Sequence, residues 1–462
     1  MYSKIISKSL LGMLFVLSLV NGLALASALP KSPRSSHPEG VPLIMFSTDV
    51  ANGLISTHGA QGSSPVSFSA TATYQRDTAV APQDVDDGFT LAMALNLDAQ
   101  GLVEVDSIIP TYGNAPLPEE MAVALFLTRI MKQRPDIPVI PGAMAQASQT
   151  LHGTSQWFSG ANVQIEGANG SFAISCRNSG VEMMYRRLIN SHKPITILAI
   201  GPLTDVACLL TTSPEIKDKI AEIIILASRL EGKSVSVNGK IVNDFNFRMD
   251  PIAGALLLGS EAARKIPIRL ITFSLSGQTS QSGDLIEFNS STLKGPTPAT
   301  PESQFSLNLL LQSSVPRMQF WESIFGTPQG PFDQYTLTAA VWPELFNCQP
   351  ALAYIQQCPT PAWSPLYPTD SEGNPTQKPY NAPDNRCMDH GTENGASLSE
   401  IPAELVVSLN LNNPGPLIRG ITGIDGNIPN LNQRALPVTA CTDFASPAAR
   451  QLFQELLYKY TW

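Results

Sequence analysis

Basic residues are scarce in this chain. Its 462 residues include 29 Lys and Arg against 38 Asp and Glu, for a formal net charge of −9. Proteins that bind nucleic acid rely on basic contacts to phosphate, so this balance argues against a nucleic-acid partner. The six cysteines form no Cys-x-x-Cys pair, which argues against a thiolate zinc site. Beyond the N-terminal segment, no apolar run is long enough to span a bilayer.

The N-terminal residues have the order of a secretory signal peptide. Lys4 and Lys8 precede an apolar stretch over residues 10–25, and two Ala-x-Ala patterns follow. An uncleaved membrane anchor is the rival interpretation, but glycine and polar residues interrupt the apolar stretch. We therefore expect residues 1–26 to be removed, with no membrane span left afterwards. The protein is then expected to be secreted, into the extracellular space or the periplasm.

The cysteines suggest disulfide bonds. An even number of cysteines in an exported chain indicates pairing, although the sequence does not give the connectivity. Four of the six lie in the Pro-rich last quarter, at Cys348, Cys358, Cys387 and Cys441. Cys208 lies instead in an apolar helical pattern, where a buried free thiol fits the sequence equally well.

Apolar strand patterns alternate with helix patterns over the first two thirds of the chain. The expected strands are residues 41–46, 103–110, 137–140, 194–200, 220–226 and 266–273, and the expected helices are residues 88–97, 119–134, 203–212 and 252–264. This alternation predicts an α/β fold with an open, mostly parallel, doubly wound (Rossmann-like) sheet that carries helices on both faces. Ligands of such sheets bind beyond the carboxyl ends of the strands.

We expect an α/β domain over residues 27–346 and a C-terminal extension over residues 347–462. Residues 50–83 are rich in Ser, Thr, Gly and Ala and lack a helical period, so they predict a long loop inserted in the domain. The extension is rich in Cys and Pro, and we expect it to be loop-rich and packed on the main domain. Within it, residues 404–411 predict a strand and residues 447–460 an amphipathic helix.

Acidic residues crowd the start of one helix pattern. Asp84, Asp86 and Asp87 lie within four consecutive positions. Carboxylates repel one another, so such a cluster needs donor groups, water or a cation to neutralise it. The first turn of a helix supplies part of that neutralisation, and a hard divalent cation held by oxygen ligands supplies more. An acidic loop that merely caps a helix is the alternative.

Other polar residues lie at strand ends or in the loops that follow. Asp49 ends the first strand, and Asn114 follows the strand at residues 103–110. Residues with ordinary structural interpretations are Asn238, Asp244 and Asn246, which suit turns, and Asp333, which suits a helix cap. A shared position at the carboxyl edge of the sheet nevertheless favours a common site.

Several short motifs occur in a fixed order over residues 41–346. They are Ser47-Thr48-Asp49, Val85-Asp86-Asp87, Thr111-Tyr112-Gly113-Asn114, residues 136–143, His152-Gly153, residues 201–205, Asp244-Phe245-Asn246 with Asp250-Pro251, and Asp333 ahead of residues 342–346. In these motifs the chain resembles the inosine–uridine-preferring nucleoside hydrolase family. The N-terminal signature of that family is Asp-Thr-Asp, a short spacer and Asp-Asp. Residues 50–85 separate the two halves of this signature, and the segment beyond residue 346 looks like that of the longer, secreted members.

The resemblance implies a bound Ca²⁺. The implied ligands are the carboxylates of Asp49, Asp87 and Asp333 and the backbone carbonyl of Ile200. Carboxylate and carbonyl oxygens are the ligands that Ca²⁺ prefers, and the 2′- and 3′-hydroxyls of a ribose would complete the coordination. The residues that would hydrogen-bond the sugar are Asp86, Asn114, Asn238, Asp244 and Asn246.

The implied reaction is hydrolysis of the N-glycosidic bond of a nucleoside, giving free base and ribose through an oxocarbenium-like transition state. A calcium-bound water would be the nucleophile, with Asp49 as its general base. His152 matches one histidine that lies near the base in some family members. The other such position carries Phe332, which shifts base recognition toward aromatic contacts from Phe332, Trp157 or Phe158. Asp244 stands where the family usually has Glu.

Two other functions remain open on the sequence alone. A non-catalytic nucleoside- or sugar-binding protein on the same scaffold would bind ligand with calcium and release no ribose. A phosphohydrolase using Asp84 and Asp86 is the weaker option, because no lysine or Gly-rich phosphate loop accompanies that pair. The expected partner is a small-molecule nucleoside, and the sequence does not decide between a monomer and a homo-oligomer.

Overall fold

The chain divides into two compact units, Met1–Gly40 and Val41–Trp462. The computed structural model describes residues 40–52, 54–56, 74–76, 85–144, 148–150, 162–163, 172–176, 178–231, 236–237, 240–241, 244–276, 301–325, 329–357, 403–412, 422–423, 426–427 and 435–461. The predicted signal peptide lies outside the described residues. Among the helices of the described part, none combines the length and hydropathy needed to cross a membrane.

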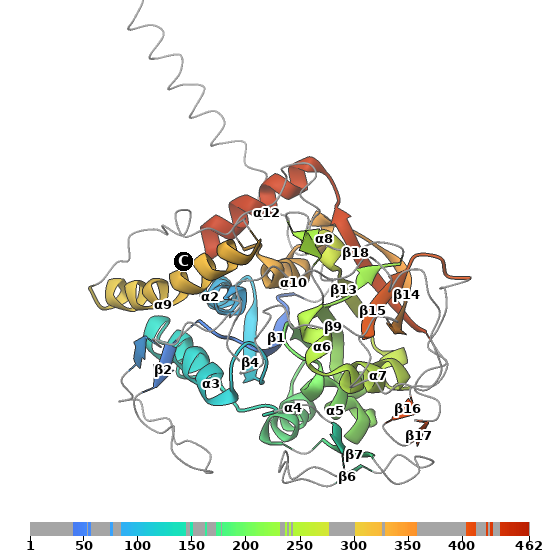
Figure 1. Cartoon of the computed structure of the whole chain (residues 1–462). Coiled ribbons are helices and arrows are strands. Elements are labelled where there is room, and N and C mark those ends of the chain that lie inside the picture. The colour runs from blue at the N-terminus through green and yellow to red at the C-terminus, as the bar shows by residue number, and fades with distance from the viewer. Residues whose placement is uncertain are drawn as a thin grey trace, which may run out of the picture. The chain divides into compact units, whose positions relative to one another are not determined.

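Nine of the described strands form one mixed sheet, in the order β10-β15-β14-β18-β13-β9-β8-β1-β4 (Figure 1). Their bounds are β1 Leu43–Thr48, β4 Glu104–Pro110, β8 Ile195–Ala199, β9 Ile220–Leu226, β10 Arg229–Leu230, β13 Ile268–Ile271, β14 Phe346–Gln357, β15 Ala403–Ser408 and β18 Leu436–Phe444. From β4 to β18 every neighbouring pair is parallel, whereas β14 runs antiparallel to β15 and β18. The predicted open, mostly parallel α/β sheet is confirmed.

Helices cover both faces of this sheet (Figure 1). Side chains alternate along β1, so that Ile44 and Phe46 enter one core cluster while Leu43 and Met45 enter the other. The first cluster packs under α2 (Asp86–Ala99), α9 (Pro301–Phe325), α10 (Phe332–Val341) and α12 (Pro447–Tyr460). The second packs under α4 (Ser179–Asn190), α5 (Thr204–Thr212) and α7 (Pro251–Gly259). Burial on both faces explains why these strands read as continuous apolar runs.

Shorter elements connect these layers. The helices are α3 (Leu117–Leu125), continued by a π-helix (Phe126–Met131), then α6 (Phe245–Met249), α8 (Phe273–Ser276) and 3-10 turns at Pro214–Lys219, Ala263–Lys265 and Pro343–Leu345. The small strands pair as β2 (Leu54–Ser56) with β3 (Tyr74–Arg76), β7 (Phe172–Ser175) with β5 (Ser148–Thr150) and β6 (Asn162–Val163), β11 (Ser236–Val237) with β12 (Lys240–Ile241), and β16 (Thr422–Gly423) with β17 (Gly426–Asn427).

Three local predictions were wrong in detail. Residues 137–140 do not form a strand; only Val139 makes a bridge, to Ile108, because prolines on both sides of residues 139–140 cannot donate to a ladder. The predicted helix at residues 119–134 starts two residues earlier and changes to a π-helix after Leu125. The inserted loop contains the antiparallel pair β2–β3.

The residues on either side of the insertion lie close together. The Nδ2 of Asn52, just after β1, donates a hydrogen bond to the carbonyl of Val85, just before α2, over 3.1 Å. The same Nδ2 lies 3.1 Å from the Oγ of Ser314 on α9. The end of β1 and the start of α2 are therefore neighbours in space despite the residues between them.

The C-terminal part of the chain contributes strands to the same sheet. β14, β15 and β18 extend it beyond β13, and a disulfide joins register partners Cys348 and Cys441 of β14 and β18. A second disulfide joins Cys176 to Cys208 on α5, which overturns the free-thiol alternative for Cys208. Disulfides are typical of oxidising compartments. Cys358 and Cys387 lie outside the described residues.

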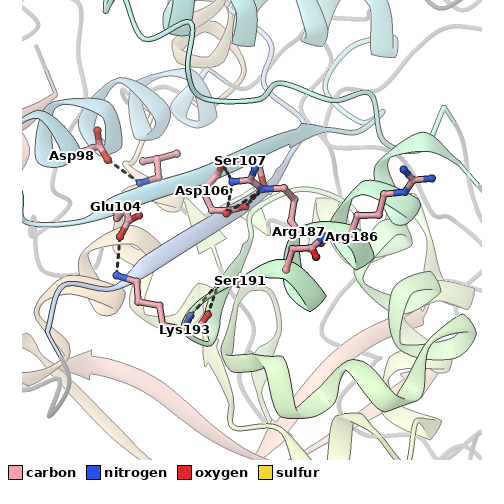
Figure 2. A network of polar contacts seen from close by, with 10 residues as sticks. Asp98, Glu104, Asp106, Ser107, Arg186, Arg187, Ser191 and Lys193 are labelled. Atoms are coloured by element: carbon pink, nitrogen blue, oxygen red, sulfur yellow. Dashed lines mark hydrogen bonds and ion pairs between the residues drawn. The ribbon is translucent and has the colours of Figure 1, made fainter.

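Ion pairs tie β4 to the segments around it (Figure 2). Arg187 of α4 donates to both carboxylate oxygens of Asp106, with the shortest distance, 2.6 Å, between Nη2 and Oδ1. Lys193 lies 2.8 Å from Glu104, at the first residue of the strand. Both pairs involve the first three residues of β4. The carboxyl end of the strand, which is the end at which ligands of such sheets bind, lies at Pro110.

Candidate metal centre

Asp49 lies just beyond β1, in a niche that two glycines keep open. A Cβ atom added at Gly113 would come within 2.1 Å of Oδ2 of Asp49, and one at Gly201 within 2.9 Å of Oδ1. Oδ2 accepts the backbone N–H of Asn114 over 3.0 Å. Oδ1 is buried and has no hydrogen-bond partner in the described part of the chain. Asp49 therefore holds one oxygen in place and keeps one for another ligand.

Three further carboxylates meet at the N-termini of two helices. Asp86 and Asp87 lie in the first turn of α2 and Asp333 in the first turn of α10. One oxygen atom from each lies within 4.8 Å of the others, close enough for all three to bind one cation. All three are buried, so little water is available to neutralise them. The two helix N-termini supply part of the compensation, because their free N–H ends carry partial positive charge.

Asp86 is held by residues at and near the start of α10. Its Oδ2 accepts the backbone N–H of Asp333 over 3.0 Å, and its Oδ1 accepts the Nε2 of Gln329 over 3.2 Å. Gln334 donates to the Asp86 backbone carbonyl over 3.2 Å. Asp86, which the sequence suggested as a sugar contact, is thus also the residue that joins the two helix starts.

Asp87 connects this cluster to the strands on either side. The hydroxyl of Thr48, at the end of β1, donates to its Oδ1, and the Nδ2 of Asn114 donates to its Oδ2 over 3.3 Å. Burial, and after it the charge of Asp86, raises the pKa of Asp87 to about 7. Burial, and after it the charge of Asp87, raises the pKa of Asp49 well above its ordinary value. Without a cation the site therefore favours protonated carboxyl groups.

The donor set fits a hard divalent cation. Buried carboxylates that destabilise one another's charge, together with the unpartnered Oδ1 of Asp49, are what such an ion would neutralise. The structure brings together Asp86, Asp87 and Asp333, and hydrogen bonds of Asn114 link Asp49 to Asp87. The Ile200 carbonyl directly follows the adjacent strand β8 and accepts a hydrogen bond from the Nδ2 of Asn246 over 2.9 Å.

Asp244 and Asn246 brace neighbouring strand ends. Asp244 is the N-cap of α6: its Oδ1 accepts the N–H of Phe247 over 3.0 Å, and its Oδ2 accepts the N–H of Ser228 over 2.7 Å. Asn246 holds the end of β8 through the Ile200 carbonyl. The structure thus gives both residues backbone contacts, and their predicted hydrogen bonds to the sugar stay predictions.

Several predicted residues lie outside the described part of the chain, namely Asp84, His152, Trp157, Phe158 and Asn238. Phe332 is described and almost fully buried. Its ring centroid lies 5.7 Å from that of Trp321 and 6.1 Å from that of Phe273. Phe332 therefore belongs to an aromatic group beside Asp333.

Four further residues of the site had no role predicted from the sequence. Thr48 and Gln334 are next to the predicted ligands Asp49 and Asp333, and this adjacency was the only feature of the sequence that indicated a role for them. No feature of the sequence indicated a role in the site for Gln329 or Glu120. Glu120, on α3, is fully buried, and its Oε1 accepts the N–H of Ala115 over 3.1 Å. It thereby fixes the loop that carries Asn114.

Known proteins resemble parts of this chain. A family model described as inosine-uridine preferring nucleoside hydrolase matches residues 77–386. A pyrimidine-specific ribonucleoside hydrolase of Salmonella enteritidis is 33% identical over 187 residues, which are 38% of this chain and 54% of that protein. A pyrimidine-specific ribonucleoside hydrolase of Salmonella typhi is 32% identical over 187 residues, with the same coverage. The chain thus spans about half the length of these curated relatives.

Solved structures extend the likeness to most of the chain. A plant nucleoside hydrolase aligns with 90% of this chain and 99% of its own at 16% identity, with a TM-score of 0.50. At that identity the likeness concerns the fold alone. The family match begins at residue 77, after Asp49 and the whole of β1. The place of Asp49 in the site therefore rests on the geometry described above.

Proposed function

Because the chain belongs to the inosine-uridine preferring nucleoside hydrolase family, we propose that it hydrolyses the N-glycosidic bond of ribonucleosides, giving free base and ribose. The observation that carries the proposal is the meeting of Asp86, Asp87 and Asp333 at one point, with Asp49 linked to them by Asn114. These residues come from distant parts of the chain and lie beside the carboxyl ends of β1 and β4, where ligands of such sheets bind.

The cation would be Ca²⁺, held by Asp49, Asp87, Asp333 and the Ile200 carbonyl, with Asp86 beside them. When bound, it would supply Lewis acidity that lowers the pKa of water and orients the ribose diol. The protein contributes the rigidity of the ligands: Thr48 and Asn114 fix Asp87, and the glycine niche fixes Asp49.

The catalytic role falls to Asp49. Its Oδ2 is anchored by the Asn114 N–H, and its Oδ1, which would lie against the cation, would also accept a proton from the attacking water beside it. The water oxygen bonds to C1′ of the ribose, the bond from C1′ to the base nitrogen breaks, and the base leaves with the electron pair and takes a proton from His152. The sugar carries positive charge in the transition state, which the buried carboxylates stabilise.

The remaining contacts are assigned by chemistry. Asp86, Asn114, Asn238, Asp244 and Asn246 are proposed to contact the sugar, and His152 the leaving base. Phe332, packed with Trp321 and Phe273 in a buried aromatic group, is adjacent to Asp333 in the chain and is proposed to contact the base. Export through the predicted signal peptide agrees with the two disulfides.

The test is release of free base and reducing sugar from a panel of purine and pyrimidine nucleosides, with calcium and with a chelator. Asp49→Asn should lower kcat by about 10²–10⁴ while nucleoside binding persists, since a general base contributes about that factor. Asp218→Asn, on an exposed carboxylate before the amino end of β9, is the matched control and should keep full activity. Nucleoside binding without any release of base would favour the non-catalytic binding protein instead.

A further inference from the structure

Ser228 has an unusual backbone conformation at the edge of the site. It follows β9 with a φ of 83°. This left-handed region favours glycine, because the Cβ of any other residue is crowded there. Strained residues of this kind persist where surrounding contacts fix the backbone, and they cluster at functional sites.

Hydrogen bonds on both sides fix Ser228. Its N–H donates to Oδ2 of Asp244 over 2.7 Å, and its carbonyl accepts the N–H of Phe273 over 2.9 Å. Its side chain is fully buried, as are the carboxylates of the metal centre. The Ser228 Oγ has no hydrogen-bond partner among the residues that the structure describes. A buried hydroxyl left unpaired is costly, so a ligand that pairs with it gains affinity.

The strand register places the backbone of Ser228 near the acidic cluster. Ser47 of β1 pairs with Ala199 of β8, which pairs with Ile225 of β9. Asp49 and Ala227 lie two residues further along the chain, just past the ends of β1 and β9, and continuing the register puts them two strand spacings, about 10 Å, apart. Ser228 is the next residue, and a ribose that has C1′ beside Asp49 spans most of that distance.

We propose that the hydroxyl of Ser228 binds the 5′-hydroxyl of the nucleoside and selects for it, an assignment that rests on the proposed hydrolysis. The 2′- and 3′-hydroxyls would face the cation, so the 5′-hydroxyl is the sugar hydroxyl that remains. The carboxylate of Asp244 accepts hydrogen bonds from the N–H groups of Ser228 and Phe247. Besides its proposed contact with the sugar, this carboxylate therefore positions the backbone of Ser228.

The experiment compares kcat/KM for uridine and inosine with kcat/KM for their 5′-deoxy forms. Wild-type protein should lose about tenfold on removal of the 5′-hydroxyl, the effect of one neutral hydrogen bond. Ser228→Ala should lose about the same factor on the intact nucleosides and nothing further on the 5′-deoxy forms. Ser228→Gly should behave alike and also raise the melting temperature, because glycine accepts this φ.

Ser107→Ala is the control, since Ser107 is a buried serine within β4 that bonds Asp106, away from the carboxyl edge. It should keep the wild-type preference for the 5′-hydroxyl. The proposal is overturned if both Ser228 variants keep that preference while hydrolysing nucleosides. If wild-type protein releases no base from any nucleoside, the hydrolase function itself fails, and the 5′-hydroxyl contact fails with it.

Discussion

The backbone N–H of Asp333 donates a hydrogen bond to Oδ2 of Asp86 over 3.0 Å, although 247 residues separate them along the chain. This bond joins the first turn of α10 to the first turn of α2. Two helix N-termini therefore point their partial positive charge at one acidic cluster. This partial charge offsets only part of the cost of burial, because the pKa of Asp87 is still raised to about 7, and a bound cation would supply the rest.

Neutralising Asp333 should abolish cation binding without dismantling this junction. Asp333→Asn retains the backbone N–H that binds Asp86 and removes one charge from the cluster. We expect added Ca²⁺ to raise the melting temperature of the wild-type protein and to leave that of the variant unchanged, since ligand binding to the folded state alone stabilises it. Glu344→Gln, at an exposed position, should respond like the wild type. An undiminished calcium response in Asp333→Asn would contradict the assignment of this ligand.

The stability of the cation-free protein should fall as the pH rises from about 4 to about 7. The pKa of Asp87 is about 7 in the folded chain against an ordinary value of 3.8, so between these values the folded state binds more protons than the unfolded state. Stability decreases with pH wherever that holds. Chemical denaturation in chelator across this range measures the slope. Calcium should stabilise more at pH 7.5 than at pH 5, and equal stabilisation at both would count against a carboxylate site.

Glu120 should act on the reaction through the loop that it holds. Its Oε1 accepts the N–H of Ala115, next to Asn114, whose own N–H anchors Asp49. Glu120→Leu removes the acceptor and should lower kcat about tenfold, with a loss of stability of about 1–3 kcal/mol. Glu120→Gln retains an acceptor and should keep both kcat and stability near their wild-type values. Glu119→Leu, at the adjacent position, is the control. Loss of stability with kcat unchanged would make Glu120 purely structural.

The ion pair between Arg187 and Asp106 should stabilise the fold without affecting catalysis. Arg187 is 37% exposed and Asp106 only 6%, so removal of the arginine leaves a buried carboxylate short of its partner. Arg187→Ala should cost about 1–3 kcal/mol of unfolding free energy, less than a fully buried pair. Arg186→Ala is the matched control, because its partner Glu182 is exposed and Figure 2 shows Arg186 pointing away from Asp106. A cycle with Asp106→Asn measures the coupling, and kcat/KM should stay unchanged.

The sequence could predict the elements whose pattern is local. Buried parallel strands such as β8 and β9 read as apolar runs, and the cap at Asp250 marks the start of α7. It could not predict that β14 joins the sheet antiparallel, because pairing with β18 depends on a partner ninety residues away. The same limit applied at the site: Asp87 was recognisable from its neighbours, whereas the Gln329 contact to Asp86 has no local signal.

The hydrogen bond from Asn52 to Val85 joins a residue shortly after β1 to the residue just before α2. It holds the two ends of the insertion together, so the length of chain between them is uncoupled from the spacing of Asp49 and Asp87 in space. Closing a loop costs only about 0.6 kcal/mol more for each doubling of its length. Segments can therefore be gained or lost at this junction during evolution while the acidic residues stay in register. Ser47-Thr48-Asp49 and Asp86-Asp87 are therefore far apart along the chain but close together in the folded site.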